Sequence, residues 1–177
     1  MHHNFHYCFV KRGAKMIHNR FKCFLLYYFI YCLLIISIGV FLGAIVNKNL
    51  FKPEPLSLDH DFMFLVLSHN LRNFIMYLLA FIVSPILQLL DFGGSAFQIT
   101  IGFRTLGTQE ALNRLIPHGL LEFPNMLLYQ GISQYMLFTL IFTRSIKMTL
   151  DVMKKMIPFY LLSLIILIIA AILEGYI

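Results

Sequence analysis

The chain has 177 residues, of which 59% are hydrophobic and only 12% are charged, and its formal net charge is +6. A soluble domain is roughly 45–50% apolar and about 25% charged, so this chain has too little polar material to cover a water-facing surface. The composition excludes a soluble globular protein and indicates an integral membrane protein, whose length allows one compact domain.

Basic residues gather in two places along the chain. One group precedes the first apolar run and the other lies between two late apolar runs: Lys11, Arg12, Lys15, Arg20 and Lys22, then Arg144, Lys147, Lys154 and Lys155. Basic groups that border apolar spans indicate the cytoplasmic side of a membrane, and they predict no nucleic-acid partner. We therefore predict a basic cytoplasmic N-terminal tail at residues 1–22 and a transmembrane domain at residues 23–177.

The first predicted span covers residues 24–46, which contain no charged side chain. This run is long enough to cross a bilayer and too long for the apolar core of a signal peptide, so we expect it to be retained. Gly39 and Gly43 form a GxxxG pattern within it, which predicts a face for close packing against another helix. The odd number of cysteines, 3, predicts no disulfide framework.

Three segments of contrasting polarity follow. Residues 47–70 are predicted to be a polar connection, and residues 73–90 a second span. Ser84 and Pro85 lie inside that span and predict a kink, because proline lacks an N–H and clashes with the preceding helical turn. Residues 93–107 are glycine-rich and only partly apolar, and we interpret them as a short third span surrounded by protein.

The position of the charges decides how residues 93–107 are interpreted. The last apolar runs, at 115–142 and 158–177, are joined by the second basic group, which should be cytoplasmic. One further crossing is then required between Asp91 and the fourth span. The sequence therefore predicts an all-α, polytopic membrane helical bundle of about five transmembrane helices, with the N-terminus in the cytoplasm and the C-terminus outside.

The fourth span contains side chains that are costly in a membrane. They recur at spacings of four, three and four residues: His118, Glu122, Asn125 and Tyr129. This spacing places them on one face of a helix as a polar stripe. Pro117 is expected to open the helix and Pro124 to bend it, since Pro124 leaves the carbonyl of Leu120 without its helical partner.

The predicted topology brings further polar residues to the same outer side of the membrane. They open the second span and end the fifth: Asn70, Arg72, Asn73 and Glu174. Arg72 would then lie near Glu122 or Glu174 and neutralise a carboxylate that is otherwise expensive to bury. We expect these residues and the stripe to form one polar cluster.

Three interpretations of the His118–Glu122 pair stay open. The pair can be a structural clamp between helices, part of a conduit or pocket for a translocated ion or peptide, or a metal or catalytic site. The last interpretation is the weakest, because catalytic zinc takes three ligands from protein and the chain has no HExxH, GxSxG, GxxxxGK[ST] or CxxC motif. We predict no catalytic residue, no bound metal, no cofactor and no enzymatic activity.

The segment PHGLLEFP at residues 117–124 resembles the signature of the stage II sporulation protein M family. Two further features are in register with that family: the pair His69-Asn70 followed by Arg72, and the ending AAILE at residues 170–174. The sequence DFGGS at residues 91–95 departs from the family's pattern.

The resemblance implies a multi-pass scaffold or accessory protein rather than an enzyme. Its namesake anchors peptidoglycan-degrading partners during engulfment of the forespore, and other relatives accompany ATP-binding-cassette (ABC) proteins or bacteriocin and self-immunity genes. The expected function is a membrane subunit that supports ABC-type peptide export or immunity; a sporulation scaffold and an ion- or solute-translocating channel are the alternatives.

The resemblance also sets the expected partners and location. Besides the lipid bilayer, the expected partners are other membrane proteins, either ABC transporter subunits or cell-wall hydrolase partners, and a homo-oligomer is left open. The expected location is the cell membrane of a Gram-positive bacterium.

Overall fold

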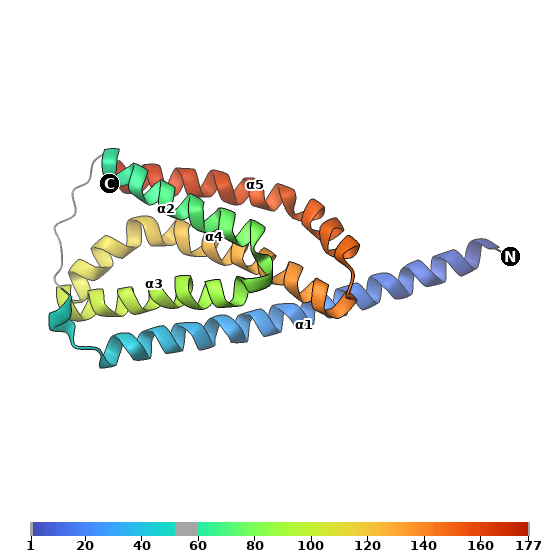
Figure 1. The fold of residues 1–177 in the computed structure, drawn as a ribbon, viewed down its shortest axis with the longest axis horizontal. Helices are drawn as coiled ribbons and strands as arrows, with labels where there is room; N and C mark the ends of the chain where they lie inside the picture. Colours follow the sequence, from blue (N-terminus) through green and yellow to red (C-terminus); the bar gives the residue numbers. More distant parts are fainter. Residues whose placement is uncertain (1, 52–59, 177) are drawn as a thin grey trace. The chain divides into compact units, whose positions relative to one another are not determined.

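The computed structural model describes the backbone of residues 2–51 and 60–176, with side chains placed except at residues 2–20, 60–62, 114, 117, 118 and 174–176. The described residues form α-helices and short 3₁₀ turns in the following order (Figure 1): α1 (His2–Ile45), η1 (Lys48–Leu50), α2 (His60–Leu79), η2 (Phe81–Val83), α3 (Ser84–Leu106), α4 (Thr108–Thr143) and α5 (Ile146–Tyr176). The described residues contain no strand, and the predicted all-α bundle is confirmed.

The chain divides into two units, residues 1–34 and residues 35–177. The first unit is the N-terminal part of α1, in which aromatic rings stack one turn apart: Phe24 on Tyr28 and Tyr27 on Tyr31, with centroid separations of 5.7 and 5.8 Å. The predicted tail at residues 1–22 is thus helical from His2 onward and continuous with the first span.

The second unit is a bundle built around α4. This helix lies between α3 and α5, and α2 packs on both α4 and α5 (Figure 1). Phe74 of α2 meets Tyr129 of α4 and Tyr160 of α5 edge-on, with ring centroids 5.6 and 5.8 Å apart. All three side chains are buried, so this aromatic contact joins three helices in the core.

The second predicted span is interrupted by a helix boundary. α2 ends at Leu79 and α3 begins at Ser84, with one 3₁₀ turn between them. Pro85 therefore stands in the first turn of α3, where the missing N–H leaves no helical hydrogen bond unmade, and the chain reverses direction at this junction (Figure 1). The prediction of one kinked helix over residues 73–90 is wrong.

The predicted third span is also wrong in its boundaries. α3 runs without interruption from Ser84 to Leu106, so residues 93–107 provide its second half rather than a helix of their own. Asp91 consequently lies in the middle of α3 instead of at a membrane boundary. The helix boundary that the sequence predicted near the glycines lies earlier in the chain, at the junction between α2 and α3 just before Pro85.

Three other boundaries differ from those predicted. α2 begins at His60, so the polar connection is shorter than residues 47–70. α4 begins at Thr108, directly after Gly107 with φ of 84°, and its ribbon bends in the first half, which contains Pro117 and Pro124 (Figure 1). α5 begins at Ile146 and contains Pro158 in its interior, so the predicted start of the fifth span at residue 158 is wrong.

The GxxxG pattern of α1 packs against α3, as predicted. A Cβ atom on Gly39 would collide with the backbone carbonyl oxygen of Gly93, and one on Gly43 would lie 2.7 Å from Cβ of Thr100 and 3.0 Å from the carbonyl oxygen of Phe97. Glycine is required at both positions because the two helix backbones approach too closely for a side chain.

Arg104 of α3 holds the end of α1. One of its terminal guanidinium nitrogens donates to the carbonyl oxygens of Gly43 and Val46, at 2.6 and 2.7 Å. Carbonyls in the last turn of a helix lack intrahelical donors, and a cation at that end also meets the negative end of the helix dipole. Arg104 therefore fixes where α1 ends relative to α3.

Replacing Arg104 with methionine is expected to lower the free energy of unfolding by about 1–3 kcal/mol, because two carbonyls lose charge-assisted hydrogen bonds. Unfolding in increasing dodecyl sulfate, followed by circular dichroism, measures the change. Lys155→Met, which removes an exposed cation from α5, is the matched control and should stay within about 0.5 kcal/mol of the wild type. Equal losses in the two variants would contradict the structural role of Arg104.

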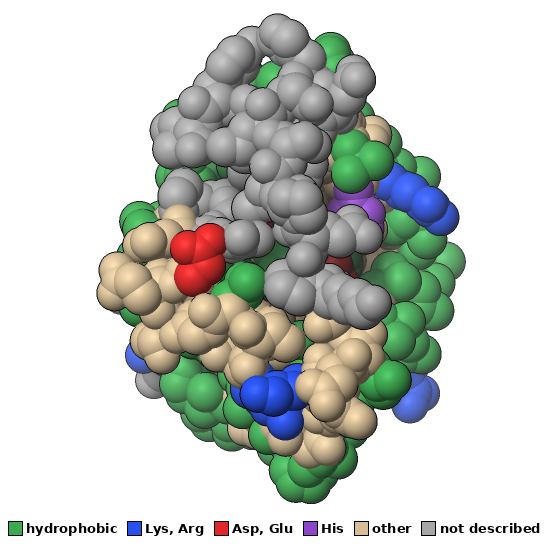
Figure 2. Space-filling model, turned by 90° about the vertical axis from the view of Figure 1, so that its left-hand side faces the viewer, with side chains coloured by type: hydrophobic (Ala, Val, Ile, Leu, Met, Phe, Trp, Pro, Cys, Tyr) green, Lys and Arg blue, Asp and Glu red, His purple; other side chains and the backbone are tan. Residues whose placement is uncertain are grey.

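The surface of the bundle suits a lipid environment. Within the described part of the chain, three helical segments are long and apolar enough to cross a membrane: Phe21–Ile45, Phe81–Leu106 and Ile146–Leu173. Hydrophobic side chains cover most of the flanks seen in Figure 2, where charged side chains are few and separate. The protein is thus a membrane protein, while five crossings and a cytoplasmic N-terminus stay predictions.

Candidate functional site

Asp91 of α3 is the centre of a hydrogen-bond network, the Asp91 network, which consists of Asn73, Tyr77, Asp91 and Gln130. The two carboxylate oxygens accept separate donors: Oδ1 from Asn73 Nδ2 at 3.1 Å and Oδ2 from Gln130 Nε2 at 3.1 Å. Gln130 Nε2 also donates to the hydroxyl oxygen of Tyr77 at 3.1 Å. Tyr77 and Gln130 are fully buried, so the network joins α2, α3 and α4 inside the bundle.

Two side-chain pairs flank the Asp91 network along α4. Nearer the start of α4, Asn70 Nδ2 donates to Glu122 Oε1 at 2.9 Å. Nearer its end, the buried Gln134 donates from Nε2 to Oε1 of the buried Gln88. Amide and carboxylate side chains thus connect α4 to α2 and α3 over several turns.

Two side chains of α4 bond to the backbone of neighbouring helices. Ser133 Oγ donates to the carbonyl oxygen of Tyr77 at 2.7 Å, and Asn125 Nδ2 donates to the carbonyl oxygen of Ser163 at 3.0 Å. The first bond ties α4 to α2 and the second ties it to α5. Interhelical hydrogen bonds of this kind fix helix register where the surrounding lipid offers no alternative donors.

Some buried polar atoms have no hydrogen-bond partner among the described residues: Ser84 Oγ, Asn125 Oδ1, Gln130 Oε1, Gln134 Oε1 and Ser163 Oγ. Three of these are amide oxygens whose own nitrogens donate to another helix. An acceptor that stays unpaired in a low-dielectric interior costs about 1–3 kcal/mol.

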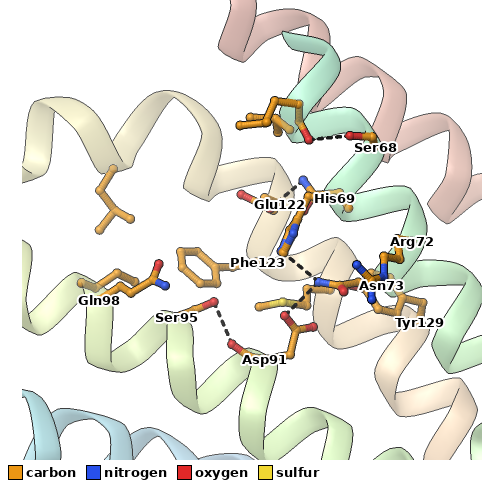
Figure 3. Close-up of a pocket in the computed structure, with 16 residues that line it drawn as sticks. Ser68, His69, Arg72, Asn73, Asp91, Ser95, Gln98, Glu122, Phe123 and Tyr129 are labelled. Carbon is orange, nitrogen blue, oxygen red and sulfur yellow. Dashed lines mark hydrogen bonds between the residues drawn. The ribbon is translucent and has the colours of Figure 1, made fainter. Parts of the chain in front are cut away.

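An open cavity of about 700 Å³ lies between α2, α3 and α4. Figure 3 shows Asn73 and Asp91 directed toward one another, with Glu122 and Phe123 reaching the same space from α4. A second open cavity, of about 510 Å³, lies on the α2–α3 side and shares Asn73 and Asp91 with the first. The carboxylates of Asp91 and Glu122 therefore both border the first cavity, which a polar solute can enter.

The structure brings most of the predicted polar residues together around the first cavity. These are Asn70, Arg72, Asn73, Glu122 and Tyr129. Asn125 lies one turn along α4 and faces a smaller void beside Glu122. The side chains of Pro117, His118 and Glu174 fall outside the described residues.

Arg72 forms no ion pair with Glu122, one of the two carboxylates predicted as its partner, and the other, Glu174, has its side chain outside the described residues. Arg72 is exposed, lines both cavities, and Glu122 accepts from Asn70 instead. The reason is helical geometry: residues two apart on a helix do not face the same way, so Asn70 meets Glu122 directly while Arg72 borders the cavity at a different angle.

Sequence reasoning missed the following members of the polar core: Tyr77, Gln88, Asp91, Gln130, Ser133 and Gln134. The signal on α4 was present, because Ser133 continues the stripe four residues after Tyr129, and Gln130 and Gln134 are also four apart. On α3, placing a boundary at Asp91 hid its periodicity with Gln88, three residues earlier.

The described residues do not support a metal site built from a cluster of strong ligands. No group of three or more His, Cys, Asp or Glu side chains among them is placed to hold a metal ion. His69, which lines the first cavity, contacts Asn73 with 3.3 Å between its Nε2 and the amide nitrogen. The site instead combines two carboxylates with neutral amides, a phenol and an exposed arginine.

Residues 29–177 of the chain match the sequence model of a family described as stage II sporulation protein M. The match covers most of the chain and includes all the helices that form the cavity. No curated protein and no solved structure matches the chain.

Proposed function

Because the chain belongs to the stage II sporulation protein M family, we propose that it is a non-catalytic membrane subunit supporting an ABC-type peptide or bacteriocin export or self-immunity system. The observation that carries this proposal is the pairing of polar side chains with one another across α2, α3 and α4. Groups engaged in this way hold helices together and are not presented as an activated nucleophile with its base. The chemistry is then supplied by the partners.

The first part of α5 is the surface best suited to a cytoplasmic partner. Lys147, Lys154 and Lys155 are exposed there, and the predicted topology places them in the cytoplasm. An ABC ATPase is a cytoplasmic protein, and exposed lysines favour association with an acidic surface. We therefore place the partner's docking surface at residues 146–157.

Changing all three lysines to glutamate is expected to reduce the amount of ABC ATPase that co-purifies with the tagged chain from its native membrane by about tenfold or more, because like charges oppose docking. Partners are identified by mass spectrometry after mild solubilisation. Lys48→Glu, which reverses an exposed charge on η1, is the control and should leave the yield unchanged. Circular dichroism confirms that each variant keeps its helices.

The alternatives give different outcomes in the same experiment. Cell-wall hydrolases in place of an ATPase would support the sporulation scaffold and contradict the export role. An ion- or solute-translocating channel is favoured by the open cavity that borders Asp91 and Glu122. In that case, proteoliposome flux should appear without any partner and should fall in the Glu122→Gln variant.

A further inference from the structure

The first cavity continues into an apolar hollow between the end of α3 and the start of α4. The hollow has a volume of about 200 Å³ and shares three lining residues with the cavity: Gln98, Ile99 and Leu115. The rest of its lining carries no polar side chain: Gly102, Phe103, Leu106 and Ala111. Figure 3 shows Gln98 and Phe123 at one end of the cavity, with Arg72 and Tyr129 at the other. The cavity and the hollow thus form one groove along α3.

Gly102 lies at the apolar end of this groove, and close packing does not explain its presence. A Cβ atom on Gly102 would meet nothing within 4 Å, whereas one on Gly39 or Gly43 would collide with α3. Glycine inside a helix costs roughly 0.5–1 kcal/mol relative to alanine. The missing side chain therefore leaves space in the hollow instead of letting two helices approach.

The charged end of the groove has a place for one positive charge. The carboxylates of Asp91 and Glu122 accept hydrogen bonds from neutral amides. Among the described residues that line the cavity, these two carboxylates stand beside one guanidinium, that of Arg72, when His69 is counted as neutral. A ligand with a single ammonium group would equalise the charges and could donate to either carboxylate.

The length and chemistry of the groove decide what carries that ammonium group. An inorganic cation gains nothing from the apolar end, whereas an ammonium group attached to apolar side chains uses both ends. Asp91 and Gly102 are 11 residues apart in α3, or about 16 Å along the helix, which an extended peptide covers with about five residues. The exposed amide of Gln98 lies on the way and can both donate to and accept from a peptide backbone.

We propose that this groove binds the amino-terminal segment of an extended apolar peptide. Its ammonium group lies at Asp91 and Glu122, and an apolar side chain about five residues later occupies the hollow over Gly102. The biological setting rests on the proposed role in peptide export or immunity, for which this site names the substrate class. The binding itself involves only this chain, so it is measurable without an ABC ATPase.

The test is isothermal titration of the purified full chain in detergent with a pentapeptide of alternating leucine and alanine, amidated at its carboxyl end. Acetylation of its amino terminus is expected to weaken binding about tenfold or more, because it removes the charge and keeps the side chains. Replacing the leucines with serine should weaken binding to a similar degree, because the hollow then gains no apolar contact.

The peptides also give the outcomes that would overturn the proposal. Equal affinity for the free and acetylated peptides would exclude the ammonium site, and equal affinity for the leucine and serine peptides would exclude the apolar end. Absence of binding by all three peptides would overturn the whole inference.

Gly102→Leu tests the apolar end without disturbing the fold. A Cβ atom at this position has open space and leucine favours a helix, so the unfolding midpoint should not fall. The larger side chain fills the hollow, so affinity for the leucine peptide should decrease about tenfold. Ile86→Phe enlarges an exposed apolar side chain of α3 that borders neither cavity nor hollow, and it should bind like the wild type. Unchanged affinity in Gly102→Leu would contradict the proposal.

Glu122→Gln tests the charged end, because it keeps the shape of the side chain and removes its charge. The preference for the free over the acetylated peptide should fall severalfold in this variant, and Asp151→Asn, at an exposed position of α5, should retain it. A full preference in Glu122→Gln would contradict the assigned position of the ammonium group; if this variant does not fold, the peptide pair and Gly102→Leu still decide. Loss of the ATPase with peptide binding intact would contradict the proposed function alone.

Discussion

Asp91→Ala is expected to lower the free energy of unfolding by about 2–3 kcal/mol, since it removes the acceptor for both Asn73 and Gln130. Gln130 is fully buried, and a buried donor without a partner costs about 1–3 kcal/mol. Gln130 keeps only its bond to Tyr77 in this variant. Unfolding in dodecyl sulfate, followed by circular dichroism, measures the loss; the chain has no tryptophan for fluorescence.

Two comparisons make this prediction specific to the Asp91 network. Asp91→Asn keeps one of the two acceptor oxygens but places an amide N–H opposite one of the two donors. The free energy of unfolding should therefore fall by about 1 kcal/mol. Asp151→Ala removes an exposed carboxylate from α5 and should change stability by less than about 0.5 kcal/mol. An Asp91→Ala protein as stable as the wild type would mean that Asp91 does not join the helices.

Gly39→Leu is expected to be the most disruptive single change in α1, with a loss of about 3 kcal/mol. The backbone carbonyl oxygen of Gly93 occupies the space that even a Cβ atom would need. A backbone atom cannot move aside as a flexible side chain can, so α1 must separate from α3. The expected result is a lower unfolding midpoint and faster cleavage of the chain near η1 by trypsin.

The control for this variant is Ala44→Leu, which adds a similar side chain to an exposed position of the same helix. It should leave both the midpoint and the rate of proteolysis near those of the wild type. If Gly39→Leu and Ala44→Leu behave alike, the GxxxG pattern is not the packing face of α1, and the close approach of the two backbones is disproved.

The polar stripe of α4 shows what helical periodicity can predict and what it cannot. Spacings of four, three and four residues predicted that His118, Glu122, Asn125 and Tyr129 share a face, and the structure places the last three toward the interior, while the side chain of His118 lies outside the described residues. A helical period depends only on local geometry, so it is written in the sequence. The sequence does not show which residue on another helix each of these side chains contacts. Asn70 and Arg72 are about equally far from Glu122 along the chain, and only the rotation of α2 brings Asn70 to Glu122.

Asp91 shows where the sequence argument failed. A charged residue beside Gly93 and Gly94 suggested the end of a span, whereas the helix continues through it. The cost of placing Asp91 inside a helix bundle is offset by donors from two other helices, Asn73 and Gln130. Those donors are 18 and 39 residues away in the chain, so no local pattern could reveal the compensation.

The sequence by itself determined that this is an all-α membrane protein, which family it resembles, where α1 has its close-packing glycines, and which face of α4 is polar. These properties follow from composition, helical period and short motifs, all of which act over a few turns. The tertiary structure decided that α2 and α3 separate at Pro85, that Asp91 is central, and that Asn125 binds the backbone of α5. These depend on the rotation and register of packed helices, which are set by contacts between residues far apart in the chain.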